Sequence, residues 1–402
     1  MKKVLGIVLL VLALTLVSVP AFAQKAELSL KYWHAGVGGA DLWVADYQVA
    51  DELDYPAHGY YDYDFSKEKL VLQPAMGGSF ILSGSYYLSP STSVAISYWG
   101  LSRADTVGVK FIDKDDKEES LEDEDGPYWR YRSYMLTLPW WEIPWEFYSD
   151  RSQWAGNSYF DGKAVLVAEG NLSMSALDIA GTKTLAGSGW EVGLSGGVRR
   201  AVFAQDQSTG LELSGGYFDD DIDDIEYVAY SSEKWNLGLD SRLDITAIGP
   251  QVGIEGKYAL GNKLVLKAGA KAGILFGTAT SDATWSVNNW DYEEVEDSYK
   301  WVLDGFADVS YTATDSVQIS TYDLSASLGY QITEQWSVEA GYYASLWKRV
   351  PSLRFFKYDP EETDPCDDPI SYRCDSKKAT WEQPEARDIV VSGLTVGVNF
   401  KF

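Results

Sequence analysis

The sequence contains two histidines, His34 and His58, the side chains best suited to proton transfer near neutral pH. His34 shares its parity with the apolar residues of an alternating segment, and His58 lies in the tyrosine-rich stretch 55–65. Acidic residues are plentiful, but no spacing pairs one with either histidine. The sequence also lacks G-x-S-x-G, H-E-x-x-H and phosphate-binding glycine motifs. We therefore expect no enzyme and no cofactor, and a His/Asp hydrolase remains the alternative.

The two cysteines, Cys366 and Cys374, lie close together near the C-terminus. In an exported protein such spacing predicts one small disulfide loop. A zinc-binding pair is the weaker interpretation, because no histidine lies nearby.

Acidic residues gather in runs at 113–125, 219–226, 291–297 and 359–368. Clustered carboxylates can bind divalent cations such as calcium, but none of these runs has the pattern of an EF-hand loop. A solvated acidic surface is the simpler interpretation. The formal net charge of −27 also argues against a nucleic-acid partner, whose phosphates it would repel.

The N-terminus has the three parts of a secretory signal: Lys2 and Lys3, an apolar run at 4–17, and Ala21-Phe22-Ala23 before a cleavage point. We expect the signal to occupy 1–23 and the mature protein to occupy 24–402. A membrane anchor is the alternative, but the run is short for a span. Residue 24 is glutamine, which disfavours a lipoprotein.

After the signal, no stretch approaches the roughly 18 apolar residues of a membrane-spanning helix. A closed β-barrel is the other backbone that crosses lipid with all its amide groups paired. The 27 tyrosines, 16 tryptophans and 36 glycines fit such a barrel, whose aromatic girdles lie at the two membrane interfaces. We therefore predict an all-β, transmembrane, antiparallel up-and-down barrel in the outer membrane.

Alternation of apolar and polar residues marks about ten strands, grouped as four hairpins plus a first and a last strand that pair with each other. The expected strands are 26–35, 78–88, 94–101, 172–184, 190–203, 242–260, 264–278, 318–332, 336–347 and 388–402. Turns inside the hairpins are short, as on the periplasmic side of a barrel. Long acidic extracellular loops are expected at about 36–70, 103–161, 206–240, 282–315 and 350–386.

The loop at 103–161 leaves the strand count open between ten and twelve, because a further pair could lie around 131–141. Its aromatic stretches, 128–132 and 138–148, need cover from lipid or the barrel mouth, or could stack on a ligand such as a sugar ring. Pro139 and Pro144 argue against a regular strand through the second stretch.

The C-terminal strand alternates cleanly and ends on Phe400 and Phe402. A terminal aromatic on an alternating strand resembles the signal read by the barrel-insertion machinery of the outer membrane. An edge strand of a soluble sandwich is the alternative, which the N-terminal signal disfavours.

Parity also predicts which charged residues face the lumen, because a charge at the centre of the lipid face costs about 2–4 kcal/mol. The expected lumen-lining residues are Arg199, Arg242, Glu255, Lys257, Lys267, Lys271, Asp323 and Glu339, with Glu27, Lys31, Asp178, Glu191, Asp244 and Lys401 on the same parity. Arg200 breaks the alternation, so it lies either above the membrane or at a bulge. A lumen of balanced charge suits either a narrow water-filled pore or an interior filled by side chains.

Short segments resemble the pore-forming major outer membrane protein family first described in Legionella. They are 176–180, 197–201, 248–253, 258–262 and 273–277, together with the C-terminal strand. The likeness covers mainly 170–280 and 388–402, and it departs at Arg200, where the family usually has an aromatic residue. It implies a weakly selective pore and supplies no catalytic residues.

Two functions follow as hypotheses. The first is a porin-like pore for small hydrophilic solutes, with a cation preference from its acidic rim. The second is a closed barrel that displays surface loops for adhesion or ligand binding. In either case the expected surroundings are outer-membrane lipid and lipopolysaccharide.

Overall fold

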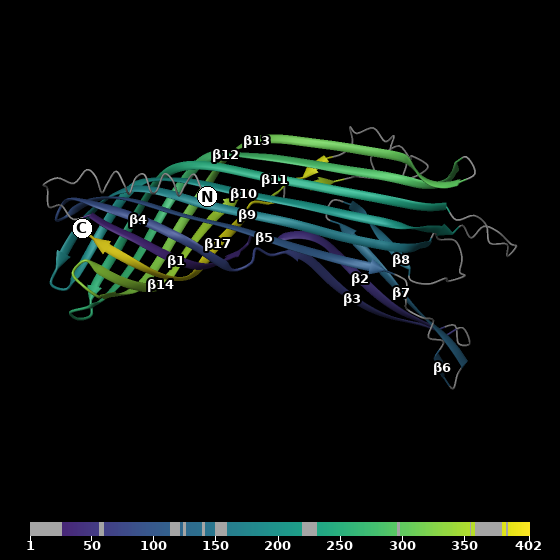
Figure 1. Cartoon of the computed structure of the whole chain (residues 1–402), viewed down its shortest axis with the longest axis horizontal. Coiled ribbons are helices and arrows are strands. Elements are labelled where there is room, and N and C mark those ends of the chain that lie inside the picture. The colour runs from purple at the N-terminus through teal and green to yellow at the C-terminus, as the bar shows by residue number, and fades with distance from the viewer. Residues whose placement is uncertain are drawn as a thin grey trace.

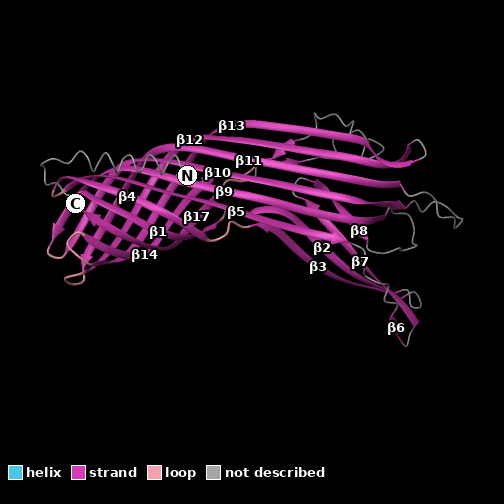
Figure 2. Cartoon of the chain, viewed as in Figure 1, coloured by secondary structure: helices cyan, strands magenta, loops and turns pink. Residues whose placement is uncertain are grey.

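The computed structural model describes residues 26–55, 60–112, 121–123, 126–138, 141–148, 159–218, 231–295, 298–353, 355–357, 380–382 and 385–402. Strands make up almost all of this part of the chain (Figure 2). The described residues contain no helix long and apolar enough to cross a membrane. The expected signal at 1–23 and the cysteines Cys366 and Cys374 lie outside the described residues.

Ten strands form a closed antiparallel barrel in the order β1-β17-β14-β13-β12-β11-β10-β9-β5-β4. Their bounds are β1 Ala26–Gly38, β4 Gly77–Ser89, β5 Thr92–Ile112, β9 Tyr159–Gly187, β10 Trp190–Phe218, β11 Ser231–Ala259, β12 Leu264–Val295, β13 Ser298–Gln331, β14 Trp336–Val350 and β17 Arg387–Lys401. The first and last strands pair from Glu27–Lys401 to Gly38–Val390 and close the ring. The predicted barrel and its four hairpins are therefore confirmed, and the wall has ten strands, the lower end of the predicted range.

Strands β9–β13 are 29 to 34 residues long. A membrane needs only about 9–11 residues of tilted strand, so most of each strand lies beyond it. Figure 1 shows these strands running far past the ends of β1, β4, β14 and β17. The expectation of loops at 206–240 and 282–315 is thus wrong for the described residues there, which are strand. These segments keep strand pairing above the membrane, where polar outward residues carry no lipid penalty.

Residues in the ranges expected to be the loops 36–70 and 103–161 form a second sheet, separate from the barrel wall. It contains β2 (Leu42–Tyr55), β3 (Tyr60–Leu72), β6 (Leu121–Asp123), β7 (Gly126–Leu138) and β8 (Trp141–Tyr148), paired in the order β3-β2-β7-β6 with β8 also on β7. The additional strands suspected around 131–141 therefore exist but lie outside the barrel wall. A short pair, β15 (Phe355–Lys357) and β16 (Thr380–Glu382), lies in the range expected to be the last loop.

Strand β8 corrects the expectation that prolines exclude a strand through 138–148, because it contains Pro144. Two features accommodate the proline. β8 pairs only with β7 among the described strands, and the β7 register shifts between Leu136 and Leu138, opposite Pro144. An edge strand with an irregular register is where a residue without an amide hydrogen is tolerated.

The polar and apolar faces of the barrel wall exchange places along the length of the strands. Near the short turns, large apolar residues such as Ile254 and Leu324 point outward, while charged residues point inward. Farther along the same strands, the outward positions are polar and the inward positions, such as Leu239 and Ile245, are apolar and buried. The lower part is therefore built for lipid outside, and the upper part for water outside. This change of surroundings marks the edge of the membrane.

Candidate functional site: the barrel interior

Four charged residues meet in one cluster across the lumen. Arg199 donates from Nε and Nη2 to the two carboxylate oxygens of Asp178 at 2.7 and 2.8 Å, and it also pairs with Asp323. Lys271 adds a contact of 3.3 Å to Asp178. Charges buried this deeply are stable only when paired and hydrogen-bonded, and each carboxylate here has a cationic partner. Sequence parity placed all four residues inward, but only the fold brings them together.

A second cluster lies beside it. Lys31 from β1 and Lys267 from β12 both bind Glu339 on β14, Lys267 at 2.7 Å, and Asn399 of β17 donates to the same carboxylate at 3.2 Å. We call the two clusters the ionic layer; it comprises Lys31, Asp178, Arg199, Lys267, Lys271, Asp323 and Glu339.

Below the ionic layer, toward the short turns, the charged groups are more exposed. Tyr87 donates a hydrogen bond of 3.2 Å to Glu27, and Lys257 lies 3.5 Å from Glu191. Glu255 points inward on the same face of β11 as Lys257 and is exposed. This end of the lumen is lined by polar side chains of mixed charge.

Above the ionic layer lie four aromatic side chains from three strands, which we call the aromatic layer: Trp33, Trp99, Tyr343 and Trp347. Trp33 contacts Trp99 and Tyr343 edge to face with ring centroids 5.5 and 5.1 Å apart, and Trp99 contacts Trp347 at 6.0 Å. The expected lumen-lining residues were all charged, so the sequence analysis did not single out these four. Trp33 and Trp99 could have been found from their parity, because each alternates with the lipid-facing residues of its strand.

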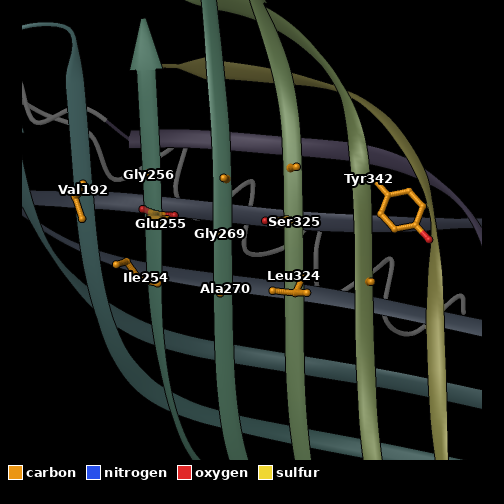
Figure 3. A pocket seen from close by; sticks show the side chains of 12 residues that line it. Val192, Ile254, Glu255, Gly256, Gly269, Ala270, Leu324, Ser325 and Tyr342 are labelled. Atoms are coloured by element: carbon orange, nitrogen blue, oxygen red, sulfur yellow. The ribbon is translucent and has the colours of Figure 1, made fainter.

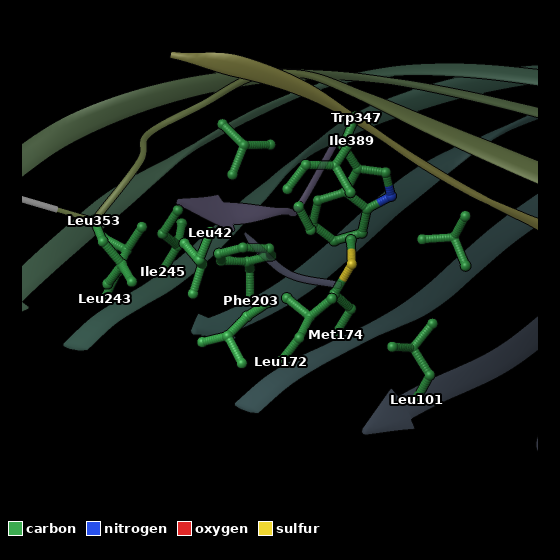
Figure 4. Close-up of a cluster of buried hydrophobic side chains, with 14 of the residues drawn as sticks. Leu42, Leu101, Leu172, Met174, Phe203, Leu243, Ile245, Trp347, Leu353 and Ile389 are labelled. Atoms are coloured by element: carbon green, nitrogen blue, oxygen red, sulfur yellow. The ribbon is translucent and has the colours of Figure 1, made fainter. Parts of the chain in front are cut away.

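An apolar layer lies above the aromatic one, on β5, β9–β13 and β17. Figure 4 shows its side chains converging from opposite walls, and it comprises Leu101, Leu172, Met174, Phe203, Leu243, Ile245, Leu275, Ile319, Ile389 and Val391. Leu42, at the start of β2, and Leu353, after β14, complete the layer from above. Two hydrogen bonds fix the chain before β2 across the mouth: Gln205 Nε2 donates to the Ala40 carbonyl at 2.9 Å, and Arg387 donates to the Asp41 carbonyl.

The structure corrects the lumen assignment of Arg242 and Asp244. Both lie on the outward face of β11, because the inward positions there belong to Leu243 and Ile245. Arg242 Nε donates to Asp244 at 2.6 Å, and this hydrogen bond raises the pKa of Arg242 above its ordinary value. Charged residues are tolerated on this face because it lies above the apolar band that touches lipid. The parity of β11 is unbroken over its length, so Arg242 and Asp244 lie on the same face as Val252 and Ile254.

Arg200 also lies on the outward face, next to the buried Arg199. The pairing of β10 with β9 and β11 runs without a register shift, so the bulge interpretation is wrong. Its partner on β11 is Ile248, near the last outward apolar position of that strand. Arg200 therefore marks the upper edge of the lipid-facing band.

The remaining predicted sites are placed only in part. The aromatic rings of Phe400 and Phe402 contact each other edge to face, with centroids 4.6 Å apart, on the outward face of β17. Lys401 is exposed opposite Glu27. His34 is exposed on the outward face of β1. Within the described residues, no group of three or more His, Cys, Asp or Glu side chains is arranged to hold a metal ion.

A protein-family model described as the Legionella pneumophila major outer membrane protein precursor matches residues 27–402, nearly the whole chain. The chain belongs to the Legionella major outer membrane protein family. The protein is therefore an integral outer-membrane β-barrel. The match extends over the long outer strands and the second sheet, well beyond the third of the chain in which short motifs carried the likeness.

Three solved structures are similar to this family member. The outer membrane protease OmpT from Escherichia coli is 12% identical, with 96% of this chain and 99% of that chain covered and a TM-score of 0.39. The translocator domain of the autotransporter NalP from Neisseria meningitidis is 9% identical, with 100% and 96% covered and a TM-score of 0.20. The toluene transporter TodX from P. putida is 8% identical, with 95% and 90% covered and a TM-score of 0.18. A search of curated proteins finds no match.

Proposed function

We propose that this family member is a barrel closed along its axis, which carries an extended β-structure beyond the membrane for contact with a ligand or a neighbouring surface. The observation that carries the proposal is the burial of the lumen-facing side chains. Trp33, Phe203 and Trp347 are 0% exposed and Arg199 is 1% exposed, although all four point into the barrel. A water-filled pore would leave such side chains in contact with solvent.

Three successive layers support the closed interior. The ionic layer ties opposite walls together by ion pairs, the aromatic layer packs edge to face, and the apolar layer excludes water above both. Interiors of small barrels are commonly filled by side chains in this way. The proposal assigns no reaction to His34, which is exposed on the outer face of β1.

The test is ion conductance in planar bilayers after reconstitution of the purified barrel. We expect no steady current from the wild type. Heat-modifiable mobility of the protein recovered from the bilayer-forming vesicles serves as the control that folded barrel was present. Steady ohmic current from the wild type would overturn the closed-barrel proposal.

The outer part of the structure has its own test. An epitope inserted between Val295 and Ser298, at the far ends of β12 and β13, should be labelled by antibody on intact cells. Labelling that requires permeabilised cells would contradict the assignment of this end to the exterior.

A porin-like pore is the second candidate, and the observation that favours it is the solvent-accessible charge of two lysines in the ionic layer. The side chains of Lys271 and Lys267 are 40% and 27% exposed there. If the wild type conducts, Lys267→Glu and Lys271→Glu should change conductance at all salt concentrations. Cation preference from the loop carboxylates should instead fade as ionic strength rises, because exposed charges are screened beyond about 10 Å at 0.1 M salt.

A further inference from the structure

The membrane-facing wall is hollowed across strands β10–β14. The groove has a volume of about 510 Å³. Its floor consists mainly of small outward residues, and Figure 3 shows larger side chains around it: the floor is Gly256, Ala268, Ala270, Ala326 and Ala344, and the larger residues are Val192, Ile254, Leu324 and Tyr342. Glu255, Gly269 and Ser325, on the inward parity of the same strands, also line it.

The strand register explains why the floor is continuous. Gly256 pairs with Ala268, and Ala268 pairs with Ala326 on the next strand. Ala270 lies one outward position farther along β12, between Ile254 and Leu324. Small residues are thus aligned across three strands. The backbone there lies open between the taller neighbours.

The groove faces lipid rather than water. Ile254, Leu324 and Tyr342 are 52%, 60% and 48% exposed, and they belong to the apolar outward band of the barrel. An apolar patch of this kind would promote aggregation if it were exposed to water. It therefore suits a lipid environment, and a molecule that fills it must itself be apolar. Any occupant therefore comes from the bilayer or from another membrane protein.

The height of the groove selects the leaflet. Ala268 lies five residues beyond Lys263, which ends the short turn between β11 and β12. At about 3.3 Å per residue this is about 16 Å along a tilted strand, so the groove lies in the half of the membrane nearer the periplasm. Lipids of that half approach it with their head groups at the turn.

A positively charged side chain, that of Lys263, lies at the turn where such a head group would be. Lys263 is exposed, and its amino group lies over the ring of Tyr330, 5.9 Å from the centroid. A lysine at the membrane edge attracts anionic lipid, and a ring face orients its ammonium group. On a chain with a formal net charge of −27, this is a local site of the opposite sign.

We propose that the groove binds one acyl chain of a glycerophospholipid whose phosphate lies at Lys263. A second copy of the barrel fits less well. A stable protein interface buries at least about 1,000 Å² with complementary shape, and a barrel wall cannot reach a floor set beneath Ile254, Leu324 and Tyr342. A flexible single chain can. The site lies on the outside of the wall, so this proposal does not depend on whether the lumen conducts.

The experiment is native mass spectrometry of the full barrel after exposure to phosphatidylglycerol vesicles and extraction in mild detergent. The wild type should retain one phospholipid when other lipid has been stripped. Filling the floor with A268L/A326L should lower that retention about tenfold, the equivalent of about 1.4 kcal/mol. Ala340→Leu is the matched control, because Ala340 is outward and exposed on β14 but does not line the groove.

Lys263→Gln separates the phosphate contact from the groove. It should weaken retention of phosphatidylglycerol while leaving retention of an uncharged diacylglycerol unchanged. Equal retention by A268L/A326L and Ala340→Leu would overturn the groove, and an unaffected Lys263→Gln would overturn the phosphate contact. A mass of two chains that is lost in A268L/A326L would assign the surface to a second copy instead.

Discussion

Arg199 of β10 and Asp323 of β13 form an ion pair inside the barrel, although 124 positions separate them in the sequence. Arg199 also holds Asp178 through two hydrogen bonds. One guanidinium group therefore joins strands β9, β10 and β13 from within. Two strands, β11 and β12, lie between β10 and β13 in the wall. The contact between Arg199 and Asp323 therefore crosses the lumen rather than joining neighbouring strands.

Replacing Arg199 by methionine should destabilise the folded barrel. Removal of one partner from a buried ion pair leaves a buried charge without compensation, which costs about 3–5 kcal/mol. The measurement is the unfolding midpoint in urea for the barrel reconstituted in vesicles. The exposed Arg242→Met is the control and should unfold with the wild type. The triple variant D178N/R199M/D323N should recover part of the loss, and a triple variant no more stable than R199M would argue against the unpaired-charge explanation.

Gly39→Ala should destabilise the outer mouth. Gly39 has φ of +79°, and an added Cβ would lie 2.1 Å from the carbonyl oxygen of Asp388. Strain at such a backbone position costs about 1–3 kcal/mol before the clash is counted. The urea midpoint again measures the effect. Gly38→Ala is the neighbouring control, because nothing lies within 4 Å of its Cβ position. Equal midpoints for the two variants would show that the mouth tolerates movement at Asp388.

Deletion of Phe402 should sharply reduce assembly into the outer membrane. The lost folded-state contacts are few: its amide donates to the Ala26 carbonyl at 2.8 Å, and its ring contacts Phe400. A large defect would therefore reflect recognition during insertion rather than stability. The readout is the yield of heat-modifiable barrel in outer-membrane fractions. Phe402→Tyr, which keeps the aromatic ring, should assemble normally, and a normal yield after deletion would remove the signal role.

Cys366 and Cys374 should form a disulfide in the exported protein, because they are closely spaced and their compartment is oxidising. Mass spectrometry of protein purified from membranes should find one cross-linked peptide. Two alkylatable thiols without prior reduction would disprove the pairing. Cys366→Ser should leave one alkylatable thiol and serves as the calibration.

The sequence alone determined the barrel and located its ten strands, but it left open whether a further pair belonged to the wall. Alternation with a period of two is local, so residues such as Leu394, Val396 and Val398 identify the lipid face of a strand without knowledge of its neighbours. The same parity placed Arg199, Asp323, Lys267 and Glu339 inside. It failed at Arg242, where polarity was taken to mean inward although the outward face there meets water.

Only the tertiary structure decided how the lumen is filled. Which inward residues meet depends on the register of strands far apart in the chain and on closure of the ring, so no local pattern joins Arg199 to Asp323 or Trp33 to Trp99. The extent of the wall was also decided there. Beyond the membrane, strands persist because their inward faces bury Leu239, Ile245 and Trp285, while water accepts polar residues outside. The alternation with apolar residues outward ends where the strands leave the lipid. The pairing of the strands continues beyond that point, so the sequence pattern underestimated their length.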